Sequence, residues 1–313
     1  MTGQPPVTVA VLTFRRPETL AALLPELVAQ AADVSCGARV LVVDNDPAGS
    51  GRRTVADARP SSEVRVDYVH EPTPGIAAGR NRALAESADG DLLVFIDDDE
   101  LPHPGWLAHL LATQAATGAA AVAGTVTSRF PAPLPPWIEA GGFFDRRRLP
   151  TGTPIEVAAT NNLLLHLPQV QAAGVRFDPA FGLSGGEDTL FTRQLVAAGG
   201  RMVWCAEAVV TDVVPPERAT RAWVLRRAFS SGNSVSRVAL ALAGSPLRRV
   251  VARAEGWSRG VGRVLAGAAR WLLGVLTGDV RHRARGARSA ARGAGMLAGT
   301  AGHVYQEYGT AHG

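Results

Sequence analysis

Runs of apolar, often β-branched residues alternate in the first half of the chain with segments whose apolar residues recur at helical spacing. The runs predict four buried strands, at residues 7–13, 40–43, 64–69 and 91–96. The helical spacing predicts helices beginning near residue 15 and covering residues 76–85 and 104–116. Strands that are apolar throughout and alternate with helices are typical of an α/β fold with a mostly parallel sheet flanked by helices.

Polar residues gather where the predicted strands end. Thr13 closes the first strand and Asp44 follows the second, while Asp97, Asp98 and Asp99 follow the strand at 91–96. Ligands of parallel α/β sheets bind outside the carboxyl ends of the strands. In an extended chain Asp97 and Asp99 point to one side and Asp98 to the other, which suits a Mg²⁺ or Mn²⁺ ion carrying phosphates. A solvated acidic turn is the alternative for these acids taken alone.

Composition removes several kinds of chemistry from consideration. The 313 residues are 46% hydrophobic, enough to bury a substantial core, and all 32 residues counted as Lys or Arg are Arg. Without lysine, the chain lacks a Schiff-base lysine and the lysine of a Walker A phosphate loop. Cys36 and Cys205 have no spacing typical of a disulfide framework or a zinc site. The first residues lack the pattern of a signal peptide, and we therefore expect a cytoplasmic protein.

Charge divides the chain near residue 218. Residues 218–313 contain 16 Arg and three acidic residues, whereas the part before them is net acidic. On a helix over 257–276, Arg259, Arg263 and Arg270 fall on one face. The opposite face carries mostly large apolar residues, namely Trp257, Val261, Val264, Ala268, Trp271, Leu272 and Val275. No apolar run approaches the roughly 20 residues that span a bilayer.

This basic helical region admits two interpretations. It suits the surface of an anionic membrane, on which amphipathic basic helices lie in the interface. Packing against its own domain, or against a second copy in a homodimer, is the equally weighted alternative. Nucleic acid is a poor partner because the region has few aromatic residues for base stacking.

Two further segments precede the basic region. Residues 127–154 are rich in Pro, Gly and Arg and include Trp137, which predicts a long connecting segment able to act as a flexible lid. The pair Glu187-Asp188 follows two glycines and precedes a helix predicted over about 190–198.

Five short motifs, in this order, resemble family 2 glycosyltransferases. They are the strand at 7–13, Val-Val-Asp-Asn at 42–45, Gly-Ile-Ala-Ala-Gly-Arg-Asn at 75–81, Phe-Ile-Asp-Asp-Asp at 95–99 and Gly-Glu-Asp at 186–188. The resemblance covers about residues 7–237 and implies the GT-A fold. We therefore expect a GT-A domain over 1–217, with a nucleotide-sugar half at 1–100 and an acceptor half at 101–217, followed by a basic helical region over 218–313.

The resemblance implies a set of residues that bind the donor. By analogy with the family's DxD element, Asp99 binds the metal and Asp97 contacts the ribose or the metal. Thr13 and Asp44 hold the nucleotide base, and Arg80 meets the base or a phosphate. Arg15 and Asp98 complete this set, and Asp212, where the family often has histidine, is a further candidate metal ligand. From the residues alone, strand hydrogen bonding for Thr13, a turn cap for Asp44 and a surface ion pair for Arg80 remain the alternatives.

The resemblance also implies residues that handle the acceptor. Asp188 corresponds to the base of the family's ED motif, which takes the proton of the acceptor hydroxyl. Its alternative role is the capping of a helix N-terminus, where a carboxylate is stabilised in its ionised form. Glu187 and Trp137 are the expected acceptor contacts.

Together these features predict an inverting transferase that depends on Mn²⁺ or Mg²⁺ and uses a UDP-, GDP- or dTDP-sugar. A single sugar is transferred to a hydroxyl of a polyprenyl-linked glycan, a polysaccharide precursor or a natural product, because the QxxRW sequence of processive synthases is missing. The basic region leaves open a peripheral position on the inner face of the membrane. A nucleotidyltransferase and a non-catalytic nucleotide-sugar-binding scaffold are the alternative functions.

Overall fold

The computed structural model describes residues 6–58 and 64–306, and the chain divides into two compact units. The sheet unit comprises Met1–Thr127, Arg146–Gly182 and Glu187–Asp212. The helical unit comprises Ser128–Asp145, Leu183–Gly186 and Val213–Gly313.

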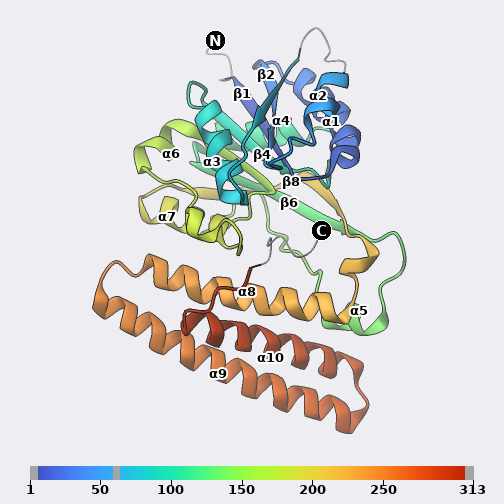
Figure 1. The fold of residues 1–313 in the computed structure, drawn as a ribbon, viewed down its shortest axis with the longest axis vertical. Helices are drawn as coiled ribbons and strands as arrows, with labels where there is room; N and C mark the ends of the chain where they lie inside the picture. Colours follow the sequence, from blue (N-terminus) through green and yellow to red (C-terminus); the bar gives the residue numbers. More distant parts are fainter. Residues whose placement is uncertain (1–5, 59–63, 307–313) are drawn as a thin grey trace. The chain divides into compact units, whose positions relative to one another are not determined.

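A mixed sheet forms the centre of the sheet unit (Figure 1). Within the described residues its strand order is β3-β2-β1-β4-β7-β6-β8-β5. The first four strands in this order are parallel, and β7 runs antiparallel to both β4 and β6. The strands are β1 (Val7–Thr13), β2 (Ala38–Asp44), β3 (Arg65–His70), β4 (Leu92–Asp97), β5 (Glu100–Pro102), β6 (Ala121–Arg129), β7 (Asn162–His166) and β8 (Met202–Val213). The parallel part consists of the four strands predicted from the apolar runs.

Alternating side chains of these strands build a hydrophobic core on each face of the sheet. Val9 and Val11 of β1 join the core packed by α1 (Pro17–Ala32) and α4 (Trp106–Thr117). Ala10 joins the core on the other face, with side chains of α3, α6 and α7. Those helices are α3 (Ile76–Glu86), α6 (Leu167–Ala173) and α7 (Glu187–Ala197), and the short α2 (Arg52–Asp57) precedes β3. The predicted α/β class, with helices on both faces, is confirmed.

Strand register decides which residues meet at the carboxyl edge of the parallel strands. Thr13 lies opposite Asp44 across the β1–β2 pair. Leu12 lies opposite Asp97 across the β1–β4 pair. The strand ends singled out in the sequence are therefore neighbours in space.

The segment 127–154 is more ordered than a plain connection. It contains the end of β6 and the short helix α5 (Pro136–Gly141), which the sequence did not predict. Pro136 at the start of α5 and Gly142 just after its end explain the helix, since proline suits the first turn and glycine the left-handed C-terminal position. The φ of Gly142 is 61°.

Three long helices make up most of the helical unit, as expected for the basic region. They are α8 (Arg221–Leu242), α9 (Pro246–Thr277) and α10 (Val280–Thr300). Figure 1 shows α10 lying between α8 and α9. None of the helices in the described part of the chain has the length and apolar character needed to cross a bilayer.

Candidate active site

The chain turns immediately after β4, and this turn carries the consecutive carboxylates. β4 ends at Asp97, Asp98 and Asp99 form the turn, and β5 begins at Glu100. Because the turn interrupts the extended backbone, the alternation of side chains expected of a strand does not continue through it. Instead of pointing to opposite sides, Asp98 and Asp99 bind the same guanidinium.

Asp98 ties the turn to the end of β1. The hydroxyl of Thr13 donates a hydrogen bond to Oδ2 of Asp98 at 2.9 Å. Nη1 of Arg16 donates to Oδ1 of Asp98 and to Oδ2 of Asp99, both at 2.9 Å. The side chain of Arg16 is 41% exposed, so water screens the ion pair between Arg16 and Asp99. Arg16 therefore competes only weakly with a metal ion for the carboxylate of Asp99.

Negative charge is crowded at Asp97. Burial raises the pKa of Asp97 to about 7, the guanidinium of Arg80 opposes the rise, and the carboxylates of Asp99 and Asp98 add to it. A positive charge placed among these carboxylates would stabilise their ionised forms.

Asp212 reaches the same edge through the pairing of β5 with β8. In this antiparallel pair Asp212 lies opposite Glu100. Burial raises the pKa of Glu100 well above its usual range, and the neighbouring carboxylates, Asp97 foremost, add to the rise. Nδ2 of Asn161 donates to Oε1 of Glu100 at 2.6 Å, and Nη2 of Arg146 donates to Oδ2 of Asp212.

The carboxylates of this edge fit a hard divalent ion that takes its remaining ligands from a substrate. Among residues 6–58 and 64–306, no group of three or more His, Cys, Asp or Glu side chains could hold a metal ion by itself. Magnesium-type ions typically use one or two carboxylates and complete their coordination with phosphates and water. Burial raises the pKa of Asp97 first, Asp99 and Asp98 raise it further, and such an ion would relieve the repulsion among these carboxylates.

Asp44 is fully buried and acts as a turn cap. Its Oδ2 accepts hydrogen bonds from the backbone N–H of Gly51 at 2.7 Å and from the hydroxyl of Tyr68 at 3.0 Å. Its Oδ1 accepts from the backbone N–H of Asp46 at 3.0 Å. This is the alternative weighed from the sequence, and contact with a nucleotide base stays a prediction for Asp44.

Arg15 follows β1 with a strained backbone. Its φ of 55° lies in the left-handed region, which residues other than glycine rarely adopt. Nε donates to Oδ1 of Asp46 at 3.3 Å, and 60% of the side chain is exposed. Strain of this kind, on the order of 1–3 kcal/mol, is concentrated at ligand sites. Contact between Arg15 and the donor stays a prediction.

Arg80 is buried and forms an ion pair with Glu187. Nη1 of Arg80 donates a hydrogen bond to Oε1 of Glu187, and the side chains are 6% and 4% exposed. The guanidinium carbon of Arg80 also lies 5.7 Å from the ring centre of Phe177, within the range of a cation–π contact. The surface ion pair considered for Arg80 is thus a buried one, which links the Asp97 edge to the start of α7.

Asn81 fixes the position of Phe177 beneath that arginine. Nδ2 of Asn81 donates to the carbonyl of Phe177 at 2.8 Å, and the backbone N–H of Phe177 donates to Oδ1 of Asn81 at 3.0 Å. The ring of Phe177 also stacks on Phe191 of α7, with ring centres 4.2 Å apart. The Arg-Asn pair of α3 therefore holds the helix that carries Glu187 and Asp188.

Asp188 lies in the first turn of α7, and one of its oxygens binds the next residue. Its Oδ1 accepts hydrogen bonds from the backbone N–H of Thr189 at 2.5 Å and from the hydroxyl of Thr189 at 3.2 Å. No hydrogen bond from the described residues reaches Oδ2 of Asp188. This local bond leaves one carboxylate oxygen that can take a proton, and the role of Asp188 as the base stays a prediction. Oε2 of the neighbouring Glu187 is buried and also has no hydrogen-bond partner among the described residues.

Trp137 belongs to an aromatic cluster of the helical unit. Its ring stacks on Phe143, with ring centres 5.2 Å apart, and the guanidinium carbon of Arg221 lies 5.0 Å from its centre. These contacts stabilise α5 and its flanks, and an acceptor contact by Trp137 stays a prediction.

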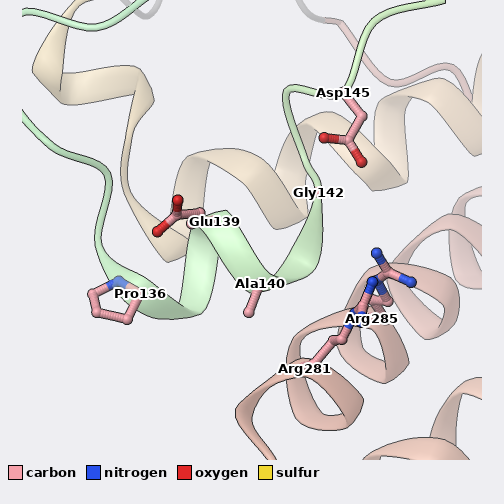
Figure 2. Close-up of a pocket in the computed structure, with 7 residues that line it drawn as sticks. All are labelled: Pro136, Glu139, Ala140, Gly142, Asp145, Arg281 and Arg285. Atoms are coloured by element: carbon pink, nitrogen blue, oxygen red, sulfur yellow. The ribbon is translucent and has the colours of Figure 1, made fainter.

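The helical unit also has an open polar pocket of about 360 Å³ (Figure 2). Arg281 and Arg285 line it from α10, and Glu139 and Asp145 line it from α5 and the segment after it. Two acidic and two basic side chains give this pocket no net charge preference, and it shares no residue with the carboxylate turn.

Sequence reasoning missed several residues that shape the site. Arg16 adjoins the predicted strand end, and its position beside Arg15 was the available signal. Phe177, Asn161 and Arg146 lie in irregular segments far along the chain, and nothing in the local pattern connects them to the acidic turn. Long-range contacts place them.

Comparison with known proteins identifies the class. The family described as Glycosyl transferase family 2 matches residues 8–166. The succinoglycan biosynthesis protein ExoM of Rhizobium meliloti (strain 1021) is 38% identical over 232 residues, which are 74% of each chain. The chain belongs to glycosyltransferase family 2, and the protein is a glycosyltransferase.

Solved structures share the GT-A fold with this chain. The mannosyltransferase PcManGT from Pyrobaculum calidifontis, in complex with GDP-Man and Mn²⁺, has a TM-score of 0.58 at 20% identity and covers 93% of this chain and 86% of its own. GalNAc-T7 with UDP, GalNAc and Mn²⁺ has a TM-score of 0.56 at 13% identity. That match covers 78% of this chain, which spans about half of GalNAc-T7 (49%). At these identities the likeness concerns the fold.

Proposed function

We propose that this glycosyltransferase moves one sugar, with inversion, from a nucleoside diphosphate sugar to a hydroxyl acceptor, using Mn²⁺ or Mg²⁺. The observation that carries the proposal is the connection made by Arg80. Its guanidinium pairs with Glu187, beside Asp188, and acts electrostatically on Asp97 at the end of β4. A donor-binding edge and a candidate base are thereby joined through one buried side chain.

The donor occupies the carboxyl edge of β1 and β4 in this proposal. Asp99 and Asp97 hold the divalent ion, with Asp212 as a further candidate ligand, and Arg15 faces the nucleotide. Thr13 and Asp98 support this arrangement from within, because their mutual hydrogen bond joins the end of β1 to the turn. When bound, the ion supplies positive charge against the charge that develops on the diphosphate.

Asp188 is the general base. Its Oδ2 takes the proton from the acceptor hydroxyl while that oxygen forms a bond to the anomeric carbon of the sugar. The bond from this carbon to the phosphate oxygen breaks, and the nucleoside diphosphate leaves with the bonding electrons. Because attack comes from the face opposite the leaving group, the anomeric configuration inverts.

Glu187 orients the acceptor. Arg80 holds one oxygen of its carboxylate, and the other, Oε2, is buried with no partner among the described residues. A buried polar atom without a hydrogen bond is costly, and a hydroxyl of an acceptor sugar would satisfy it. This supports a sugar-bearing acceptor for the reaction.

The similarity to a protein named for succinoglycan biosynthesis supports a saccharide acceptor of the polysaccharide-precursor kind. The 16 Arg in residues 218–313 favour an acceptor presented on a lipid carrier at an anionic membrane over a soluble aglycone. The missing QxxRW sequence favours the addition of one sugar in each reaction.

The variant Asp188→Asn tests the proposal. We expect it to bind donor nucleotides as the unmodified protein does and to lose transfer activity by about 10²- to 10⁴-fold, the usual contribution of a general base. Binding is measured as thermal stabilisation by UDP, GDP and dTDP with and without Mn²⁺, which also identifies the nucleotide base that the site prefers. Transfer is measured as release of nucleoside diphosphate from the matching nucleotide sugars, with alkyl glycosides as acceptors.

The exposed Asp57→Asn, in the i,i+4 pair with Arg53, is the matched control, and it should retain full activity. Transfer by Asp188→Asn at a rate close to that of the unmodified protein would contradict the assignment of Asp188 as the general base.

A further inference from the structure

α9 contacts the rest of the helical unit along a narrow stripe of glycines. The buried residues of this helix are Gly260, Gly267 and Gly274, each one heptad from the next. A Cβ added at Gly267 would come within 2.6 Å of the backbone nitrogen of Ala290 in α10. Since α10 approaches so closely on one side only, most of the circumference of α9 remains exposed.

The exposed part of α9 contains a continuous apolar face. At about 100° per residue, its members fall within an arc of roughly 100° along the helix. They are Leu247, Val250, Trp257, Val261, Leu265, Leu272, Val275 and Leu276, here called the α9 apolar face. Leu265 is 65% exposed and Leu276 is 77% exposed. An exposed apolar surface of this extent marks a docking site for a membrane or a protein.

Most arginines of α9 lie on the side of the helix opposite the α9 apolar face. Six Arg lie on α9, and four of them fall within an arc of roughly 60° whose centre is about 160° around the helix from the centre of the face, while Arg253 borders the face. The four are Arg248, Arg259, Arg263 and Arg270. The single acidic residue of this helix, Glu255, is paired with Arg259 at 2.9 Å. α9 therefore combines an apolar face with a basic polar face, and the strong positive charge of residues 218–313 favours an anionic partner.

We propose that the α9 apolar face docks on an anionic lipid bilayer, with α9 lying in the plane of the interface. Helices with a large apolar face and a basic polar face typically insert about 5–10 Å into the headgroup region. Leu247 and Leu276 stand at opposite ends of the face, so the whole length of the helix takes part. A second copy of this chain is a poorer occupant, because residues 218–313 contain 16 Arg and three acidic residues, and two such regions would repel each other.

This proposal deepens the carrier-linked acceptor proposed above, because docking brings the enzyme to a lipid-anchored substrate. The docking itself requires no sugar transfer. Asp188→Asn is therefore expected to bind membranes as the unmodified protein does, and loss of membrane binding in that variant would contradict the proposal. Failure of transfer alone concerns the proposed function and leaves the docking surface in place.

Flotation of the full chain with vesicles tests the docking. We expect enrichment on phosphatidylcholine vesicles that contain about 30% phosphatidylglycerol and at least about tenfold less on pure phosphatidylcholine. The double variant Leu265→Gln/Leu276→Gln should float at least about tenfold less well on the anionic vesicles, because two exposed leucines no longer enter the apolar layer. Both positions are exposed, so circular dichroism should show unchanged helix content.

The double variant Val235→Gln/Val304→Gln is the matched control, since these exposed residues belong to the helical unit but not to α9. It should float as the unmodified protein does. Arg253→Gln, at the border of the face, should weaken flotation by about fivefold, and the remaining binding should depend less on salt.

Two results would overturn the docking surface. One is equal flotation of Leu265→Gln/Leu276→Gln and the unmodified protein. The other is a dimer in analytical ultracentrifugation that this variant abolishes, together with no enrichment on anionic vesicles, which would assign the face to a second copy.

Discussion

The two units of this chain are stabilised in opposite ways. In the sheet unit, charged side chains are buried and depend on their partners, as in the pair formed by Arg80 and Glu187. In the helical unit, the seam between α9 and α10 consists of glycines such as Gly267 and Gly293, whose backbones nearly touch the neighbouring helix. Buried charge is destabilising unless it is paired, whereas a glycine seam tolerates no additional volume.

This difference explains what each unit can do. A site that holds charged groups out of water can bind a phosphate-rich donor and direct a proton to one carboxylate. A seam of glycines needs only a narrow strip of α9, so it leaves the large apolar residues of that helix on the surface. The same comparison shows where each unit is most sensitive to substitution.

The largest effect is expected from Arg80→Ala. Removing this guanidinium leaves the carboxylate of Glu187 buried without its partner, which should lower the free energy of unfolding by about 3–5 kcal/mol. Urea unfolding monitored by circular dichroism measures the loss. The control is Arg82→Ala in the same helix, whose partly exposed pair with Glu86 should contribute at most about 1 kcal/mol. Equal decreases in the free energy of unfolding for Arg80→Ala and Arg82→Ala would contradict the view that the buried ion pair matters more than the exposed one.

A somewhat smaller effect is expected from Gly267→Val. A Cβ at this position would lie 2.6 Å from the backbone nitrogen of Ala290 and 2.8 Å from the carbonyl oxygen of Gly286, both in α10. The collision should cost about 3 kcal/mol. The loss of stability is measured on the full chain in two ways. One is the rate of limited proteolysis within the helical unit, and the other is the thermal unfolding transition. Gly262→Val on the same helix has nothing within 4 Å and should leave both unchanged. A Gly267→Val protein as stable as the unmodified one would show that the seam accepts added volume.

The third prediction concerns pH and the sheet unit alone. Asp97 has a pKa of about 7 in the folded chain, against a usual value of 3.8. Between about pH 4 and pH 7 the folded chain keeps a proton that the unfolded chain releases, so stability falls as the pH rises through this window. In the presence of chelator, the free energy of unfolding of the unmodified protein should fall between about pH 5 and pH 8. In Asp97→Asn this decrease should be smaller by about 2 kcal/mol.

Urea titrations at intervals across that range measure the slope for both proteins. Asp57→Asn, at an exposed acid of α2, should keep the slope of the unmodified protein. Parallel slopes for Asp97→Asn and the unmodified protein would mean that Asp97 is not the group that holds the proton.

Much of the sheet unit could be predicted from the sequence. β1 was predicted with its observed bounds, and the other parallel strands were found to within a few residues, because apolar runs report burial on both faces of a sheet. The convergence of Thr13, Asp44 and Asp97 followed from the rule that parallel strands end at one edge. The roles within that edge did not follow, since Asp44 is enclosed by Gly51 and Tyr68 from other segments.

The amino-acid pattern by itself determined the α/β class, the acidic strand end and the basic amphipathic helix, because each depends on residues that are near one another in the chain. Only the tertiary structure decided that Arg16 binds Asp98 and Asp99, that Arg80 is buried against Glu187, and that glycines line the contact between α9 and α10. These contacts join residues as many as 107 positions apart. A local pattern records the tendency of a segment to be buried or exposed, and it carries no information on which distant partner satisfies a charge.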